Sequence, residues 1–178
     1  MSTAEFVHQI SFFRSQINNR RFDDGTIQIL QSLLVCKDVK SLIEVRSCLR
    51  EFLRSESISI IREIAEKTLE QKLLILEFFV RAFAVIGDIE SCLALRYEAL
   101  LMRDLKCTSC SWLQVSYTEW LNLAEHSLEN GFHAIAIKLD HVTGFIQKEK
   151  PYDWISVAFT PYWMGLKMII GFMTHSLK

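Results

Sequence analysis

Three arginines stand one helical turn apart in the first third of the chain, at Arg46, Arg50 and Arg54. Residues at i, i+4 and i+8 lie on one face of an α-helix, so this spacing predicts a cationic stripe. Guanidinium groups bind phosphates and carboxylates through paired N–H donors, and the stripe would suit a nucleic-acid backbone or an acidic partner surface. We favour the structural alternative, a solvated face with local ion pairs, because such charge stripes are common on helices.

A Cys-x-x-Cys pair, Cys107 and Cys110, is the second candidate for chemistry. Zinc needs four sulfur or imidazole ligands, and the downstream histidines His126 and His133 fall outside the usual spacing. A redox pair would need a βαβ setting, and the sequence shows none. We therefore predict a capping or loop role for both cysteines, with no metal and no cofactor.

The remaining chemical groups form no catalytic pattern. The chain lacks a nucleophile elbow, a phosphate loop, a dinucleotide fingerprint and a zincin helix. Its five histidines include no pair at i,i+4 spacing. The acidic pair Asp23-Asp24 falls where a helix is expected to begin, so capping explains it. We predict that the chain is not an enzyme.

Helices must position these side chains, because apolar residues recur with helical spacing along most of the chain. There is no proline before Pro151, which leaves long helices uninterrupted, and no stretch alternates like a strand. Ser57 is expected to cap the fourth helical stretch, and Trp112 to begin the sixth. We predict helices over residues 3–17, 23–34, 39–53, 57–86 with a break near 67–71, 88–104, 112–129 and 132–148.

A short turn pattern recurs between these helices, around Lys37, Gly87 and Gly131, which stand 50 and then 44 positions apart. That spacing exceeds the repeat of about 34 residues in tetratricopeptide arrays. We therefore predict an all-α fold of about seven helices, a right-handed α-solenoid-like stack of divergent HEAT- or TPR-like helical hairpins. Such stacks hold partners, so the pattern favours a noncatalytic scaffold or adaptor.

Composition divides the chain into two parts. Residues 1–150 are predicted to form a helical-repeat interaction domain. The whole chain has 20 Lys plus Arg against 21 Asp plus Glu, and this balance argues against strong nonspecific binding to nucleic acid. Residues 151–178 form an apolar C-terminal tail with proline and glycine, which either caps the last hairpin or is poorly ordered. Its run from Trp154 to Met173 has the length of a membrane helix, but Pro161, Gly165 and Lys167 weaken that interpretation.

The cysteines and the first residues indicate the compartment. The five cysteines are odd in number and fall mostly within helical patterns, as expected of reduced, buried thiols. The stretch from Met1 to Arg21 is charged and lacks the apolar core of a signal peptide. We expect an intracellular protein.

Six short blocks carry a resemblance to a known family. They are FFRSQI at 12–17, RRFDD at 20–24, KDVKSL at 37–42, EVR at 44–46, ALRYEALL at 94–101 and WLQVSYTEW at 112–120. Together they resemble the DOUBLE-STRAND BREAK FORMATION family of plant meiotic proteins, over about residues 5–138. The resemblance implies a nuclear accessory factor for meiotic DNA double-strand break formation, and so for homologous recombination and synapsis. It implies protein partners from the break-forming machinery, and it supplies no catalytic residues.

Two alternatives to a protein-binding scaffold stay open. The first is a DNA-binding adaptor that uses the arginines at 46, 50 and 54. The second is a helical protein tethered to a membrane by its C-terminal tail. Neither alternative involves a small-molecule substrate.

Overall fold

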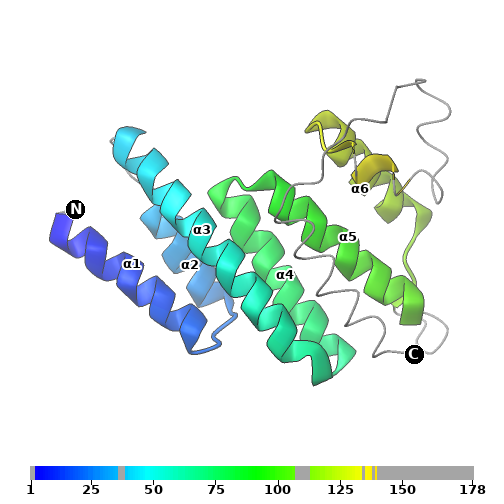
Figure 1. Ribbon diagram of the computed structural model, residues 1–178, viewed down its shortest axis with the longest axis horizontal. Helices are drawn as coiled ribbons and strands as arrows, with labels where there is room; N and C mark the ends of the chain where they lie inside the picture. The colour runs from blue at the N-terminus through cyan, green and yellow to red at the C-terminus, as the bar shows by residue number, and fades with distance from the viewer. Residues whose placement is uncertain (1–2, 36–38, 107–112, 134, 138, 140–178) are drawn as a thin grey trace.

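The computed structural model is all-α, as the sequence predicts (Figure 1). It describes residues 3–35, 39–106, 113–133, 135–137 and 139. Six α-helices and one single-turn 3-10 helix have defined bounds, residues 133, 135–137 and 139 are also helical, and none of the described residues lies in a strand. The elements are α1 (Thr3–Asn18), α2 (Asp24–Leu33), α3 (Val39–Glu63), η1 (Ile64–Glu66), α4 (Leu69–Ile86), α5 (Ile89–Lys106) and α6 (Tyr117–Glu129).

Most of the packing joins helices that follow each other in the sequence. Helix α1 packs on α2, α3 on α4, α4 on α5, and α5 on α6, while α2 also reaches α4. Figure 1 shows the helices in a row from α1 to α6, with α4 near the middle. This arrangement agrees with stacked hairpins. The right-handed solenoid winding and the boundary between residues 1–150 and 151–178 stay predictions.

The main core forms around α4, which explains why that segment is so apolar. Its side chains at Leu76, Phe79 and Phe83 are fully buried against the neighbouring helices. The ring of Phe22, from the turn after α1, lies 5.2 Å from that of Phe78 and 5.8 Å from that of Phe79, measured between centroids. Such aromatic contacts add to the burial of apolar area and fix the α1–α2 hairpin on α4.

None of the helices in the described part of the chain is long and apolar enough to cross a membrane. The apolar run at 154–173 lies outside the described residues. The predicted helix over 132–148 also falls mostly outside them, but residues 133, 135–137 and 139 of it are described and are helical.

The prediction that Ser57 begins a new helix is wrong, because α3 runs through it to Glu63. Ser57 is buried, and its hydroxyl donates to the carbonyl of Arg54 at 3.0 Å, a bond that a helix tolerates. The buried residues Leu53 and Ile60 on either side keep one continuous apolar face, which outweighs the capping preference of serine. The break predicted near 67–71 is confirmed, since α4 begins after Thr68, which accepts a hydrogen bond from the N–H of Gln71.

The predicted start of the sixth helix at Trp112 is also wrong, because α6 begins at Tyr117. Ser116 and Glu119 form a capping box, in which each side chain accepts from the other's backbone N–H, at 3.2 and 2.9 Å. This box fixes the first turn of the helix, so Leu113 and Val115 belong to the connection before it.

Two of the recurring turns lie in the described residues, and both have the expected geometry. Gly87 and Gly131 adopt left-handed conformations, with φ of 75° and 77°. The left-handed region favours glycine, which ends α4 and lets Asp88 begin α5. The third turn, around Lys37-Asp38, lies outside the described residues.

Candidate functional site

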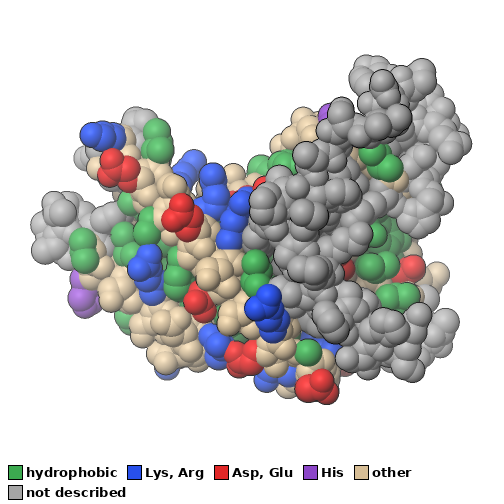
Figure 2. All heavy atoms as spheres, viewed as in Figure 1, with side chains coloured by type: hydrophobic (Ala, Val, Ile, Leu, Met, Phe, Trp, Pro, Cys, Tyr) green, Lys and Arg blue, Asp and Glu red, His purple; other side chains and the backbone are tan. Residues whose placement is uncertain are grey.

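Helix α3 carries all three arginines of the predicted stripe. Arg46 and Arg50 are exposed, whereas the side chain of Arg54 is only 27% exposed. On the face shown in Figure 2, Lys and Arg side chains are interspersed with Asp and Glu over the described helices. The surface there offers no extended field of one sign.

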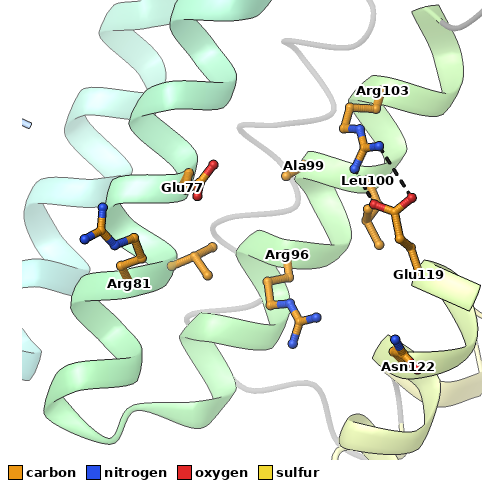
Figure 3. A pocket seen from close by; sticks show the side chains of 9 residues that line it. Glu77, Arg81, Arg96, Ala99, Leu100, Arg103, Glu119 and Asn122 are labelled. Carbon is orange, nitrogen blue, oxygen red and sulfur yellow. Dashed lines mark hydrogen bonds and ion pairs between the residues drawn. The ribbon is translucent and has the colours of Figure 1, made fainter. Parts of the chain in front are cut away.

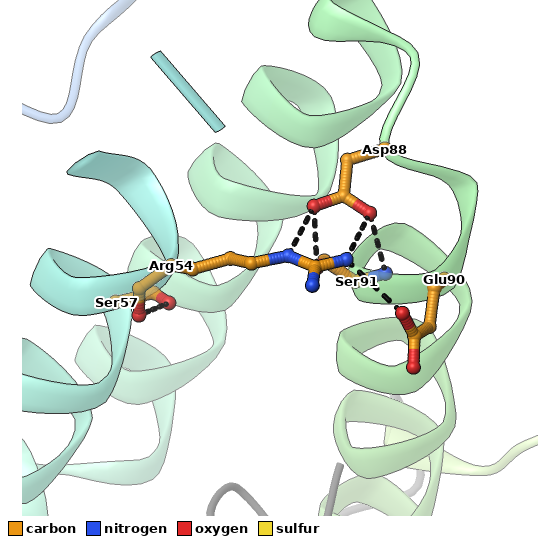
Figure 4. Close-up of polar contacts among 5 residues, drawn as sticks. All are labelled: Arg54, Ser57, Asp88, Glu90 and Ser91. Carbon is orange, nitrogen blue, oxygen red and sulfur yellow. Dashed lines mark hydrogen bonds and ion pairs between the residues drawn. The ribbon is translucent and has the colours of Figure 1, made fainter. Parts of the chain in front are cut away.

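Arg54 reaches from α3 to the turn between α4 and α5 (Figure 4). Its Nε and Nη2 each donate to a carboxylate oxygen of Asp88 at 2.7 Å, and Nη2 also donates to Glu90 at 3.0 Å. The carboxylate of Asp88, whose side chain is 3% exposed, also accepts from the hydroxyl of Ser91 at 2.7 Å and from its N–H at 3.4 Å. Arg54 therefore joins one hairpin to the next.

Arg54 and Asp88 each stabilise the charged form of the other. Burial alone would raise the pKa of Asp88, but hydrogen bonds from Arg54 and Ser91 lower the pKa below its ordinary value. The hydrogen bond to Asp88 is the main reason that the pKa of Arg54 is raised. Because the planar fork of Arg54 is already filled by carboxylates, two exposed arginines of the stripe are left to meet a partner.

The residues considered as metal or redox candidates lie partly outside the described ranges. Cys107 and Cys110 lie outside the described residues. His126 is exposed on α6, where its Nδ1 lies 3.3 Å from Nη1 of Arg96. No cluster of three or more His, Cys, Asp or Glu suited to a metal ion occurs among the residues that the structure describes.

A groove that sequence reasoning missed lies between α4 and α5, with α6 along one side (Figure 3). It consists of two adjoining cavities of about 310 and 510 Å³, which share four lining residues. We call it the α4–α5 groove. Its lining comprises Glu70, Leu73, Leu74, Glu77, Val80 and Arg81 from α4, Arg96, Ala99, Leu100 and Arg103 from α5, and Glu119 and Asn122 from α6.

Helical spacing explains why these side chains share the groove. On α4 the residues at 70, 73, 74 and 77 follow the i, i+3, i+4, i+7 pattern, and on α5 those at 96, 99, 100 and 103 do the same. Leu73, Leu100 and Val80 are half-buried, whereas Leu74 is 69% exposed. The groove therefore has an apolar strip with one leucine largely in solvent.

Two cations at the groove are already neutralised. Arg103 pairs with Glu119 at 2.6 Å and so joins α5 to α6 (Figure 3). That hydrogen bond is the main reason that the pKa of Glu119 is lowered, and its contacts with Ser116 act in the same direction. Arg81 pairs instead with Asp24 of α2, at 2.6 Å.

The acidic residues on the α4 wall, unlike Arg81 and Arg103, are not neutralised by an ion pair in the described part of the chain. Glu70 and Glu77 are exposed, and neither forms an ion pair with another residue in the described part of the chain. Figure 3 shows Glu77 and Ala99 on facing sides of the groove. Carboxylates flanking an exposed leucine are therefore the chemical feature that the α4 wall presents.

The only sequence signal for this groove was its spacing. The outward residues of α4 share the segment with core residues such as Leu76, so the apolar pattern alone does not tell the two faces apart. The pairing of Arg54 with Asp88 likewise could not be predicted from the sequence, because the two residues are 34 positions apart.

Comparison with known proteins gives one clear relative. No protein-family model matches the chain, and no solved structure matches it. The chain is 50% identical over 137 residues to a curated protein of Arabidopsis thaliana named Protein DOUBLE-STRAND BREAK FORMATION. The match covers 77% of this chain and 59% of the relative, so the chain spans about three fifths of that protein. The resemblance seen in the sequence blocks is confirmed.

Proposed function

We propose that this chain, which is similar to the Arabidopsis protein DOUBLE-STRAND BREAK FORMATION, is a noncatalytic adaptor required for making DNA double-strand breaks in meiosis. The observation that supports this is the 50% identity over 137 residues. Because the chain spans 59% of the relative, its partners and its role are carried over only as part of this proposal. The resemblance points to nuclear action beside a topoisomerase-like break-forming complex, and so to a part in homologous recombination.

The structure supports an adaptor more than an enzyme. The α4–α5 groove is lined by leucines, by ion pairs and by exposed carboxylates. Such a lining suits a protein surface, where apolar contacts give affinity and charges select the partner. Neighbouring hairpins are held together by ion pairs such as Arg54–Asp88, which gives the binding surface a fixed shape.

The DNA-binding alternative has one specific observation in its favour, the exposure of Arg46 and Arg50. Each phosphate that a protein neutralises contributes about 0.9 to the slope of log affinity against log salt concentration. Two arginines would therefore support only a weak contact, with a shallow salt slope of about 1.8. The membrane-tether alternative concerns residues outside the described ranges and stays a prediction.

Disruption of the gene tests the proposed function. The number of DNA double-strand breaks would be counted in meiocytes by immunostaining of a strand-exchange protein, with a wild-type transgene as the control. The proposal predicts that disruption removes most breaks and that the transgene restores them. A wild-type number of breaks in the disrupted line would contradict it.

A further inference from the structure

We infer that the α4–α5 groove binds an amphipathic helix of a partner protein, one that carries Lys or Arg beside its apolar stripe. The inference rests on the proposed function, because an adaptor needs a partner surface, and it adds the chemical class of that partner. Shape, exposed apolar area and charge all contribute to it.

The shape of the groove suits a helix. Each wall is a two-turn stripe with i, i+3, i+4, i+7 spacing, at residues 70–77 of α4 and residues 96–103 of α5. Helices pack by placing the side-chain ridges of one into the groove between others, at axis separations of about 8–10 Å. A helical ligand would present residues with the same spacing, as in other helix-in-groove complexes.

The apolar strip supplies the affinity. Leu74 is 69% exposed, and it lies beside Leu73 on α4 and across from Leu100 on α5. Covering a leucine of this exposure with a partner's apolar side chain would strengthen binding about tenfold or more. Leu74 is therefore expected to be an anchor point.

At the Glu70 end of the groove, the charge of the α4 wall favours a basic segment of the partner. Glu70 and Glu77 flank Leu74 on the α4 wall and form no ion pair within the described ranges, while Arg103 opposite them is neutralised by Glu119. The groove there carries uncompensated negative charge, which Lys or Arg on the ligand would neutralise.

The other end of the groove has the opposite sign. Helices α4 and α5 are antiparallel about the turn at Gly87, so Arg96 lies far from Glu70 along the groove. Its described contact is with His126, which supplies no negative charge. A helix with acids near its N-terminus and bases near its C-terminus matches both ends, and this is also the distribution that the helix dipole favours. Such a helix would lie antiparallel to α4.

A display experiment with the full chain tests this inference. The probe is a library of two-turn and longer amphipathic helices, carried on a stable helical scaffold, with the residues beside the apolar stripe randomised. We expect selected helices to carry Lys or Arg, and Leu74→Glu to weaken their binding at least tenfold. Ile43→Glu is the matched control, because Ile43 is an exposed apolar residue of α3, at 62%, and should leave binding unchanged.

Charge reversal gives a second and sharper outcome. The double variant Glu70→Lys, Glu77→Lys should no longer bind the selected basic helices. It should instead bind versions of those helices in which Lys and Arg are replaced by Glu. The same reversal at the exposed acids Glu44 and Glu51 of α3 should change neither. Circular dichroism would show that each variant keeps its helix content.

Three results would overturn the inference: no enriched helix, enrichment without basic residues, or binding unaffected by Leu74→Glu. These results are separable from failure of the proposed function. Display with the purified chain reports on the groove, whereas the number of breaks in the disrupted line reports on the function. A groove that binds basic helices in a protein whose loss leaves break number unchanged would contradict the function alone.

Discussion

Replacing Arg54 with alanine should destabilise the fold more than any other single change on the arginine stripe. The carboxylate of Asp88 is 3% exposed, and in the variant it would lose both hydrogen bonds from the guanidinium group. Breaking a fully buried ion pair costs about 3–5 kcal/mol. Here Arg54 is 27% exposed and Ser91 still donates to Asp88, so we expect a loss of about 2–3 kcal/mol in the free energy of unfolding at neutral pH.

The loss should depend on pH in a defined direction. In the native protein the pKa of Asp88 is lowered, so its stabilising contribution is complete above the unfolded pKa and disappears as the pH falls through the folded pKa. Without Arg54, burial would act with less opposition and raise the pKa of Asp88. The variant would then recover stability as the pH falls and Asp88 takes up a proton. The difference between native protein and variant should therefore shrink from pH 7.5 to pH 4.5.

Urea unfolding followed by circular dichroism at both pH values measures this difference in the free energy of unfolding. In a separate thermal melt at pH 7.5 we expect the melting temperature to fall by roughly 5–10 °C for a chain of this size. Arg50→Ala is the matched control, one helical turn away and exposed, and should change stability by less than about 0.5 kcal/mol. The reasoning would be refuted if both substitutions lowered stability equally, or if the stability lost in Arg54→Ala grew toward acid pH.

Three further predictions test other parts of the fold and the DNA-binding alternative. Ser116→Ala removes the capping box of α6 and should lower the free energy of unfolding by about 1 kcal/mol in the same assay; no change would mean that the box does not fix the helix start. Gly87→Ala should cost about 1–2 kcal/mol through backbone strain alone, because φ is +75° and an added Cβ meets nothing within 4 Å. A stability equal to that of the native protein would contradict the left-handed turn. Arg46→Ala with Arg50→Ala should leave duplex DNA affinity unchanged in a salt titration, and a loss of affinity with a smaller salt slope would favour direct DNA binding.

Much of the fold could be predicted from the sequence because helix periodicity and caps are local. Asp23 caps α2 by accepting from the N–H of Thr26 at 2.8 Å, as its place before an apolar run indicated. Gly87 ends α4 for an equally local reason. Ser57 misled the prediction because a buried serine inside a helix and a serine at its start look alike in sequence. Only the continuous packing of α3 decides between them.

The candidate site was harder to predict, because its residues are brought together by packing between helices. The spacing of the arginine stripe was visible, but the carboxylates that hold Arg54 come from the next hairpin. The α4–α5 groove depends on which leucines of α4 face outward. Leu74 and Leu76 are two positions apart, yet one is 69% exposed and the other fully buried.

The most direct test of the central claim is the number of DNA double-strand breaks in meiocytes whose own gene is disrupted and which express a groove variant. The variant carries Leu74→Glu, Glu70→Lys and Glu77→Lys, and its amount is matched to that of a wild-type transgene. If the chain supports break formation through a partner helix in the α4–α5 groove, the variant should leave breaks at the level of the disrupted line. A full wild-type number of breaks would contradict the account.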